Sequence, residues 1–546
     1  MTSPATRNSI APALAHFAFT ALAIAVVWWW LGTPVHLPPS PLGAGGKLYC
    51  VSYAPFRANQ DPMIETTYVD ARQIDEDLTL LSRYTNCVRT YSTENGQDQV
   101  AAIAQRHGMK VLQGIWLSNN AARNQRQIAA AVAIAKKFPD VVSAMVVGNE
   151  VLLRGDLSVT DLGALIGEVK AQVAPMQVTY ADVWEFWQRY SNLQNAVDFV
   201  TIHILPYWED FPLPASIAAA HVDAIRKMVA AAIPNKEIVI GEFGWPSQGR
   251  MREAARPSPS NEARAIEETA TLAQRENFRV NVIEAFDQPW KRQLEGATGG
   301  YWGTFDRSTG APKFGFDGIV SDHPDWLMQA AAGILLAAAV FGAGWWAGRG
   351  KTMPPSLWHR MVALSFLPAV LLGWTIERIP IDSFGVGGWL RSLGFAFAAV
   401  AAPIACAAAC ATGRMRPSFA ALLSRASGSR DAVSVALGLA FILLTLLSVQ
   451  TALGLVFDPR YRDIPFAPQS GAAFAFLVLM VSAPRGSEPS MAGTRAVAEA
   501  VAATVLGVAA VYIAVNETFA NWQAIWLYAG FLGLAVILAR ARDAPG

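Results

Sequence analysis

The sequence predicts an α/β protein built as a (β/α)8 TIM barrel and joined to an α-helical transmembrane domain. The chain has 546 residues, more than one hydrophobic core usually holds. Most of its charged residues lie between Lys47 and Asp325, and long runs of Ala, Leu, Val and Phe follow. In the charged part, short apolar runs alternate with amphipathic stretches. We therefore divide the chain into an N-terminal segment, a barrel and a membrane domain, at residues 1–46, 47–322 and 323–546.

The N-terminal segment contains one apolar run. Ile10–Leu31 is long enough to cross a bilayer and ends in Trp28–Trp30, which suit a membrane interface. A cleaved signal peptide is the alternative, but no small-residue cleavage site precedes the Pro-rich stretch Thr33–Pro41. We interpret the run as a retained anchor, followed by a Pro/Gly linker.

The barrel prediction depends on eight short apolar runs. Buried parallel strands read as continuous apolar runs, and an eight-fold alternation with helices favours a closed barrel over an open sheet. Amphipathic stretches between the runs include Ile74–Tyr84, Asn124–Phe138 and Ile217–Ala232. The predicted strands are Leu48–Tyr53, Asn86–Tyr91, Lys110–Trp116, Val142–Val147, Gln177–Ala181, Phe199–Ile204, Glu237–Ile240 and Arg279–Ala285.

Seven further apolar runs follow the barrel and, with the first, predict eight membrane helices. They span about 327–347, 358–376, 390–411, 432–456, 468–483, 497–515 and 522–540. Ionisable residues inside such spans would mark a transport path, and we find almost none beyond Glu499, near a helix end. This favours a passive anchor or an assembly surface, while a role in guiding substrate or docking a partner stays open.

The loops between these helices predict their orientation, because short cytoplasmic loops carry an excess of Lys and Arg. One set of alternate loops holds Arg7, Arg349, Lys351, Arg360, Arg414, Arg416, Arg425, Arg430, Arg485, Arg495, Arg540 and Arg542. The other set is poorer and holds Arg378, Arg391, Arg460 and Arg462, the last two offset by Asp458 and Asp463. We therefore expect both termini in the cytoplasm and the barrel across the membrane, in the periplasm if the membrane is a bacterial inner membrane.

Charge and cysteine content exclude some functions. The net charge is only +1, without a basic stripe, so nucleic acid is a poor candidate partner. The four cysteines show no metal-ligand spacing. Cys406 and Cys410 read as small packing residues of a membrane helix. Cys50 and Cys87 form one bridge if their compartment is oxidising, and two buried thiols are the equal alternative.

The predicted strand ends carry two glutamates. Strand four closes with Val147-Gly148-Asn149-Glu150, and strand seven is followed by Gly241-Glu242-Phe243-Gly244-Trp245-Pro246-Ser247. The chemistry of such barrels sits at the carboxyl ends of the strands, so both carboxylates should meet at one mouth. Glycoside cleavage needs such a pair, one protonated and one ionised, and a separation of about 5 Å gives retention of configuration. No metal or organic cofactor is required, and we expect neither.

These two motifs resemble those of glycoside hydrolase family 17, over residues 47–316. The resemblance implies that Glu150 is the general acid/base, that Glu242 is the nucleophile and that the substrate is a β-1,3-linked glucan. It extends to Val51-Ser52-Tyr53-Ala54-Pro55, Val88-Arg89-Thr90-Tyr91 and Glu284-Ala285-Phe286-Asp287-Gln288-Pro289-Trp290-Lys291. Many family members have an acidic residue where Gln288 stands, so a sugar contact or charge pairing there is altered.

Other residues at the strand ends are candidates for binding substrate. The amide of Asn149 could hydrogen-bond the sugar 2-hydroxyl, although a turn-forming role is the alternative. Charged groups at the rim could bind sugar hydroxyls or set the protonation of the pair, or form an ordinary salt-bridge network. We interpret His203 as a core histidine and leave it out of the catalytic set. The substrate-binding candidates are Tyr53, Arg89, Tyr91, Asn149, Tyr207, Trp208, Trp245, Glu284 and Lys291.

The motifs leave open what resolves the glycosyl-enzyme, because water and a sugar hydroxyl react by the same chemistry. An enzyme tethered by eight helices is placed to remodel a glucan that emerges from a membrane synthase. The whole chain also resembles bacterial membrane proteins known as β-1,6-glucan synthases. We therefore predict a β-1,3-glucan transglycosylase that forms β-1,6 links or branches, with a lipid bilayer and a membrane glucan synthase as partners. A membrane-anchored β-1,3-glucanase is the alternative, and a silent glucan-binding module of a transporter is a third reading.

Overall fold

The computed structural model describes two compact units. One unit is Pro34–Asp322, and the other combines the chain through Thr33 with His323 onward. Residues 34–46, which the sequence analysis assigned to the linker, therefore group with the barrel: β1 (Val35–His36) pairs antiparallel with β10 (Ile319–Val320). The described residues are 11–43, 45–57, 59–306, 308–316, 318–351, 353–423, 431–482 and 496–541.

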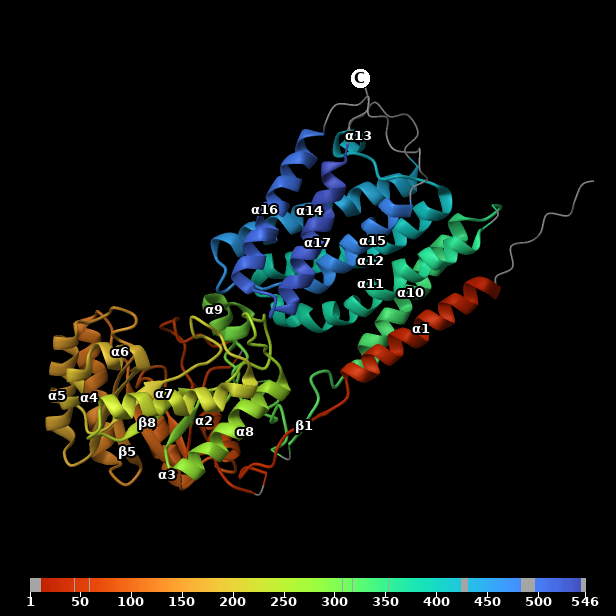
Figure 1. The fold of residues 1–546 in the computed structure, drawn as a ribbon. Coiled ribbons are helices and arrows are strands. Elements are labelled where there is room, and N and C mark those ends of the chain that lie inside the picture. Colours follow the sequence, from red (N-terminus) through yellow and green to blue (C-terminus); the bar gives the residue numbers. More distant parts are fainter. Residues whose placement is uncertain are drawn as a thin grey trace, which may run out of the picture. The chain divides into compact units, whose positions relative to one another are not determined.

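The first unit is a closed barrel of eight parallel strands (Figure 1), which confirms the predicted fold class. The barrel closes because the first strand pairs with both the second and the last. All eight strands overlap the predicted apolar runs. They are β2 (Cys50–Ser52), β3 (Cys87–Arg89), β4 (Lys110–Ile115), β5 (Val142–Asn149), β6 (Gln177–Val183), β7 (Val200–His203), β8 (Ile238–Phe243) and β9 (Val280–Val282). Of these, β5, β6 and β8 continue past the predicted ends.

Helices surround this barrel, and several begin at a polar capping residue. The side chains of Asp70, Asn120, Ser158 and Ser258 each accept a backbone N–H of the first turn, which satisfies a donor that the helix itself leaves unpaired. Their apolar faces pack on the strands. The helices are α2 (Ala71–Leu81), α3 (Val100–Arg106), α4 (Ala121–Lys137), α5 (Val159–Val173), α6 (Trp184–Arg189), α7 (Ala218–Ala232), α8 (Pro259–Glu276) and α9 (Arg292–Gly299).

A disulfide joins Cys50 to Cys87, so the structure selects the bridge from the two alternatives. The two residues begin neighbouring strands, β2 and β3. Cys406 is buried and Cys410 half-buried, and neither is bridged. The disulfide therefore ties the strand that closes the barrel to its neighbour.

The second unit is a bundle of apolar helices. All eight predicted segments are helical: seven are long and apolar enough to cross a membrane, and Phe466–Ser482 is shorter, at 17 residues. Cations predicted for the loops at Arg7, Arg425, Arg430, Arg485, Arg495 and Arg542 lie outside the described residues. The helices are α1 (Ala11–Leu31), α10 (Trp326–Ala347), α11 (Pro355–Asp382), α12 (Gly385–Thr412), α13 (Phe419–Leu423), α14 (Ala432–Phe457), α15 (Phe466–Ser482), α16 (Val497–Glu517) and α17 (Trp522–Ala539).

Polar side chains at the ends of this bundle are paired. His323, before α10, lies 2.8 Å from a carboxylate oxygen of Glu377 and packs edge-on against Trp28 and Trp374. At another helix end, Glu499 is buried and accepts the backbone N–H of Phe419 at 2.7 Å, which satisfies a donor at the start of the short α13. The His323 contacts link α1 to the start of α10.

Removing the disulfide should destabilise the barrel. Cys50→Ala/Cys87→Ala frees a loop with a sequence separation of 37 residues in the unfolded chain. The expected loss is about 3–4 kcal/mol, or a melting temperature lowered by about 5–15 °C. Intrinsic tryptophan fluorescence of the detergent-solubilised protein measures it, with Cys406→Ala/Cys410→Ala as the control. Equal melting temperatures for the two double variants would contradict the expectation.

Candidate active site

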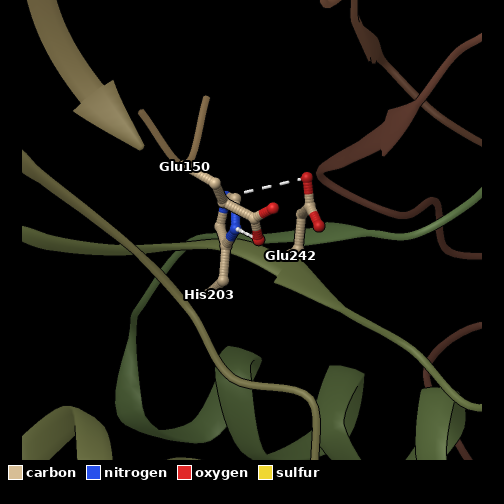
Figure 2. Close-up of side chains that lie close together, drawn as sticks. All are labelled: Glu150, His203 and Glu242. Atoms are coloured by element: carbon tan, nitrogen blue, oxygen red, sulfur yellow. Dashed lines mark hydrogen bonds and ion pairs between the residues drawn. The ribbon is translucent and has the colours of Figure 1, made fainter. Parts of the chain in front are cut away.

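The two predicted catalytic glutamates come together at the carboxyl end of the barrel. Glu242 lies in β8 and is buried, whereas Glu150 directly follows β5 and exposes 24% of its side chain. One carboxylate oxygen of each and a ring nitrogen of His203 lie within 4.8 Å of one another (Figure 2). Gly148 and Glu150 both have positive φ, +90° and +52°, so the chain turns sharply where Glu150 enters the site. A non-glycine residue held there costs about 1–3 kcal/mol, which the surrounding contacts must offset.

His203 lies between the two carboxylates, although the sequence analysis left it out. Its Nδ1 is 2.9 Å from Glu150 Oε1, and its Nε2 is 3.6 Å from Glu242 Oε1. It ends β7 and is the register partner of Glu242 on β8. Its position at a strand end was the only indication in the sequence that His203 belongs to the site, and many histidines in protein cores share such a position.

Arg89 connects the two glutamate motifs. From β3, its Nη1 donates to the Gly241 carbonyl at 2.7 Å and to Glu242 Oε1 at 3.2 Å, and its Nη2 donates to Asn149 Oδ1 at 2.6 Å. The residue is only 1% exposed. Because a guanidinium only donates, the amide oxygen of Asn149 must face Arg89. The NH2 group of Asn149 therefore points away from Arg89 and is left to donate to another group.

Tyr91 adds a second donor to Glu242. Its hydroxyl is 2.8 Å from Glu242 Oε1 and 2.7 Å from Ser52 Oγ, which itself accepts from Asn281 Nδ2 at 2.7 Å. A phenol has one proton and a carboxylate only accepts, so we assign that proton to Glu242 and the Ser52 proton to Tyr91. Burial, reinforced by the charge of Glu242, raises the pKa of Tyr91 well above its usual value, which keeps the phenol a donor.

Two ion pairs, each between a lysine and a carboxylate, lie after the last strand. Lys291 Nζ is 2.8 Å from Glu284 Oε1, and Lys313 Nζ is 2.6 Å from Asp287 Oδ1. Burial raises the pKa of Glu284 to about 7 and that of Asp287 to about 6, although each lysine opposes the shift. Glu284 and Lys291 are therefore paired with each other in this structure, rather than standing as separate rim charges.

The predicted aromatic residues divide into buried and accessible rings. Tyr53, Tyr207 and Trp245 are fully buried and give their polar hydrogens to Asp77, the Arg250 carbonyl and the Arg256 carbonyl. They pack around the site without exposing a ring face. Trp208 is partly buried and stacks on Trp302 at 6.3 Å between centroids. Trp116, after β4, is also only partly buried, and the sequence analysis did not single it out.

Gln288 is the departure from the family pattern, and its amide is fully satisfied. Its Nε2 donates to the Ala54 carbonyl at 2.9 Å, and its Oε1 accepts from Trp290 Nε1 at 2.9 Å. An ionised carboxylate could accept from Trp290 but could not donate to Ala54. A neutral amide therefore suits this buried position.

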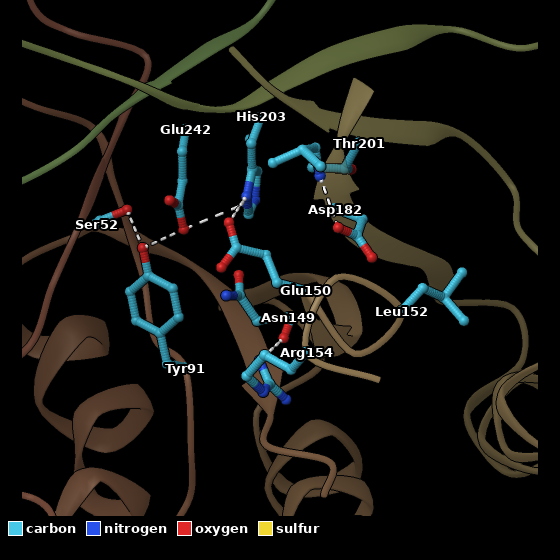
Figure 3. A network of polar contacts seen from close by, with 12 residues as sticks. Ser52, Tyr91, Asn149, Glu150, Leu152, Arg154, Asp182, Thr201, His203 and Glu242 are labelled. Atoms are coloured by element: carbon cyan, nitrogen blue, oxygen red, sulfur yellow. Dashed lines mark hydrogen bonds and ion pairs between the residues drawn. The ribbon is translucent and has the colours of Figure 1, made fainter. Parts of the chain in front are cut away.

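The cluster of Glu150, His203 and Glu242 also has the donor types of a metal site. The guanidinium of Arg89, however, lies 3.2 Å from Glu242 and 3.4 Å from His203. A second cation against the same two groups would be repelled, so the arrangement favours acid–base chemistry over metal binding. Figure 3 shows contacts running from Ser52 through Tyr91, Glu242 and His203 to Glu150.

Comparisons with known proteins match the barrel. The model of the BtgE/BtgC glycoside hydrolase domain matches residues 50–303. A probable beta-glucosidase btgE of Neosartorya fischeri is 26% identical over 270 residues, 48% of this chain and 47% of its own. A glucan 1,3-beta-glucosidase of Saccharomyces cerevisiae is 25% identical, over 43% of this chain and 82% of its own. The chain thus spans about half the length of the first of these relatives.

Solved structures give a similar result. An active-site mutant of the Rhizomucor miehei beta-1,3-glucanosyltransferase in complex with laminaritriose is 26% identical, with a TM-score of 0.44, over 51% of this chain and 98% of that one. The family match ends at residue 303, before the apolar helices that follow the barrel. The barrel is therefore similar to the BtgE/BtgC glycoside hydrolase domain and to proteins named as beta-glucosidases and glucan 1,3-beta-glucosidases.

Proposed function

We propose that this protein is a membrane-bound retaining β-glucan transglycosylase that acts on β-1,3-glucan and forms β-1,6 links or branches. The observation that carries the proposal is the pair of carboxylates, whose nearest oxygens lie within 4.8 Å. At about 5 Å an ionised carboxylate can reach the anomeric carbon directly, without room for an intervening water. The spacing therefore supports a covalent glycosyl-enzyme.

The surroundings of each glutamate support the two roles. Glu242 accepts hydrogen bonds from Arg89 and Tyr91, which hold its carboxylate in place. It is the nucleophile of this proposal. Glu150 is more exposed and protonates the leaving oxygen, then removes a proton from the acceptor. Asn149, whose NH2 group is oriented by Arg89, would donate to the sugar 2-hydroxyl, where a hydrogen bond strengthens in the transition state.

Transfer rather than hydrolysis follows from the proposed location. The apolar helices would hold the barrel beside a bilayer, opposite the Arg- and Lys-rich loops, which in a bacterium is the periplasmic face. Nucleotide sugars are not expected there, so transfer conserves the energy of an existing glycosidic bond. A membrane-anchored β-1,3-glucanase is the second candidate, and the 1,3-β-glucosidase relative favours it.

Product analysis distinguishes transfer from hydrolysis. The full-length protein in detergent is incubated with an end-labelled β-1,3-gluco-oligosaccharide, and products are separated by mass and linkage. We expect products longer than the donor, with β-1,6 bonds, and about a thousandfold or greater loss in Glu242→Gln, which lacks the nucleophile. Only shorter products would make the protein a glucanase. Equal turnover by Glu242→Gln would refute the catalytic assignment.

Arg89→Lys should impair catalysis while keeping the charge. Lysine cannot hold Glu242, the Gly241 carbonyl and Asn149 with one planar fork. Because small misplacements of reacting groups are costly, we expect kcat/KM to fall by about 100-fold or more. The matched control is Arg279→Lys, whose arginine pairs with Glu237 at the start of β8, far along the strand from Glu242. Similar losses in both variants would contradict a special role for Arg89.

Labelling with a membrane-impermeant maleimide tests the proposed side of the barrel. Cys406→Ala/Cys410→Ala provides a background in which the described cysteines have no free thiol. Ser308→Cys, exposed on the barrel unit, should react in intact cells. Arg349→Cys, exposed after α10, should react only after permeabilisation. The reverse pattern would place the barrel in the cytoplasm.

A further inference from the structure

The imidazole of His203 has no role in the reaction described above, yet it touches both catalytic carboxylates. It is fully buried, and its two nitrogens face Glu150 at 2.9 Å and Glu242 at 3.6 Å. Figure 3 shows the ring between the two carboxyl groups. The hydrogen-bond partner of Nδ1 is Glu150, and Nε2 lies between Arg89 Nη1 at 3.4 Å and Glu242 Oε1 at 3.6 Å, so the ring contacts both reacting acids.

The position of this ring is fixed by the strand next to it. A Cβ atom at Gly241 would lie 3.1 Å from His203 Cδ2 and only 2.3 Å from Thr201 Cγ2. Glycine at 241 thus leaves the space that the imidazole fills. The Gly241 carbonyl in turn accepts hydrogen bonds from Arg89 and Asn281. The ring therefore packs against a backbone segment that is itself held in place.

Hydrogen-bond chemistry assigns the protons of the ring. Arg89 Nη1 lies 3.4 Å from Nε2 but already donates to Glu242 and to the Gly241 carbonyl. Nε2 therefore keeps its own proton, directed at Glu242. The contact of 2.9 Å between Nδ1 and Glu150 Oε1 then needs one more proton, carried by either partner. Whether Nδ1 or Glu150 carries this proton, Nε2 keeps its own.

The charges around His203 favour one shared proton. Glu150 follows β5, Glu242 lies on β8 and Arg89 on β3, and their formal charges sum to −1 when both acids are ionised. One proton on the pair of Glu150 and His203 makes this group neutral. Other charged groups also influence it: the charge of Asp182 on β6 acts on His203 and that of Arg154 on Glu150, while Glu295 acts on both glutamates and Lys291 on Glu242.

We propose that His203 is the positioning residue that holds a proton for Glu150 and returns it when substrate fills the site. This inference rests on the proposed glycosidase chemistry and assigns to His203 the supply of the acid's proton. As a sugar displaces water, the ion pair of imidazolium and carboxylate is desolvated. Transfer of the proton from Nδ1 to Glu150 Oε1 removes both charges, along a hydrogen bond that already exists.

The reaction then balances without another reactant. The carboxylic acid of Glu150 gives its proton to the glycosidic oxygen as the bond from that oxygen to the anomeric carbon breaks, and Glu242 forms the new bond to carbon. In the second half, the Glu150 carboxylate takes a proton from the attacking hydroxyl as the bond to Glu242 breaks. The proton is again shared with His203, and the site is restored.

The electrostatics around Glu150 agree with this account. Burial raises the pKa of Glu150, but the hydrogen bond and charge of His203, with Arg154 and Arg89, outweigh it and lower the pKa below its usual value. While His203 holds the shared proton, Glu150 is therefore the ionised partner, and it must regain that proton before it can act as the acid. Burial also raises the pKa of Asp182 to about 6, so this neighbour is partly neutral near that pH.

Two donors with different leaving groups test the proposal in the full-length enzyme. A β-1,3-gluco-oligosaccharide needs protonation of its leaving oxygen, whereas a dinitrophenyl β-laminaribioside does not. His203→Asn keeps an amide but cannot hold a proton. We expect donor consumption, as kcat/KM, to fall about 100-fold on the oligosaccharide and less than about threefold on the aryl donor. The basic limb of the pH profile on the oligosaccharide should move down by about one to two pH units. In the variant, Glu150 must hold the catalytic proton by itself, without sharing it with His203.

The control and the second variant separate this role from a structural one. His107→Asn removes another histidine that lies 2.9 Å from a carboxylate, that of Asp75. It should change neither kcat/KM on either donor nor the pH profile. His203→Gln repeats the test if asparagine disturbs folding. Equal losses on both donors in both variants, or an unmoved basic limb, would overturn the proposal. If the wild type consumes neither donor, or Glu242→Gln consumes both, the proposed function fails, and this inference with it.

Discussion

The buried guanidinium of Arg89 is the constraint on which the site depends. A charge at 1% exposure needs nearby acceptors, and the two terminal nitrogens of Arg89 find the Gly241 carbonyl, Glu242 and Asn149. These acceptors come from two strands and belong to the two glutamate motifs. The hydrogen bonds of one arginine therefore hold both glutamate motifs in place. They also keep a positive charge 3.2 Å from Glu242, the proposed nucleophile.

The remaining contacts divide the two acids between their roles. Glu242 receives donors from Arg89 and Tyr91 and is buried, whereas Glu150 is more exposed and contacts one titratable group, His203, at 2.9 Å. The two carboxyl groups thus have different surroundings, as the proposed division into nucleophile and acid/base requires. The strained backbone of Glu150, at φ +52°, allows its side chain to reach the imidazole. The same arrangement serves hydrolysis and transfer, so the acceptor decides the outcome.

Several features of the fold and site follow from the sequence because they depend on short-range patterns. Apolar runs predict the eight barrel strands, because both faces of a buried strand are apolar. They also predict the eight apolar helices, seven of which are long enough to cross a bilayer. The roles of the aromatic residues do not follow in this way. Tyr53, Tyr207 and Trp245 are as aromatic as Trp208, but packing from distant segments buries them completely. Composition cannot tell a ring beneath a site from one on its rim.

The sequence by itself determined the order of strands and helices and the two motifs that carry Glu150 and Glu242, because a glutamate at a barrel strand end must point to the common mouth. The tertiary structure alone decided which groups meet there. The bridge between Cys50 and Cys87 forms because neighbouring strands begin at these residues. His203 lies between the glutamates because β7 is the neighbour of β8 and is separated from β5 only by β6. The contact between Arg89 and Glu242 joins residues 153 positions apart in the chain, and only the folded barrel brings them together.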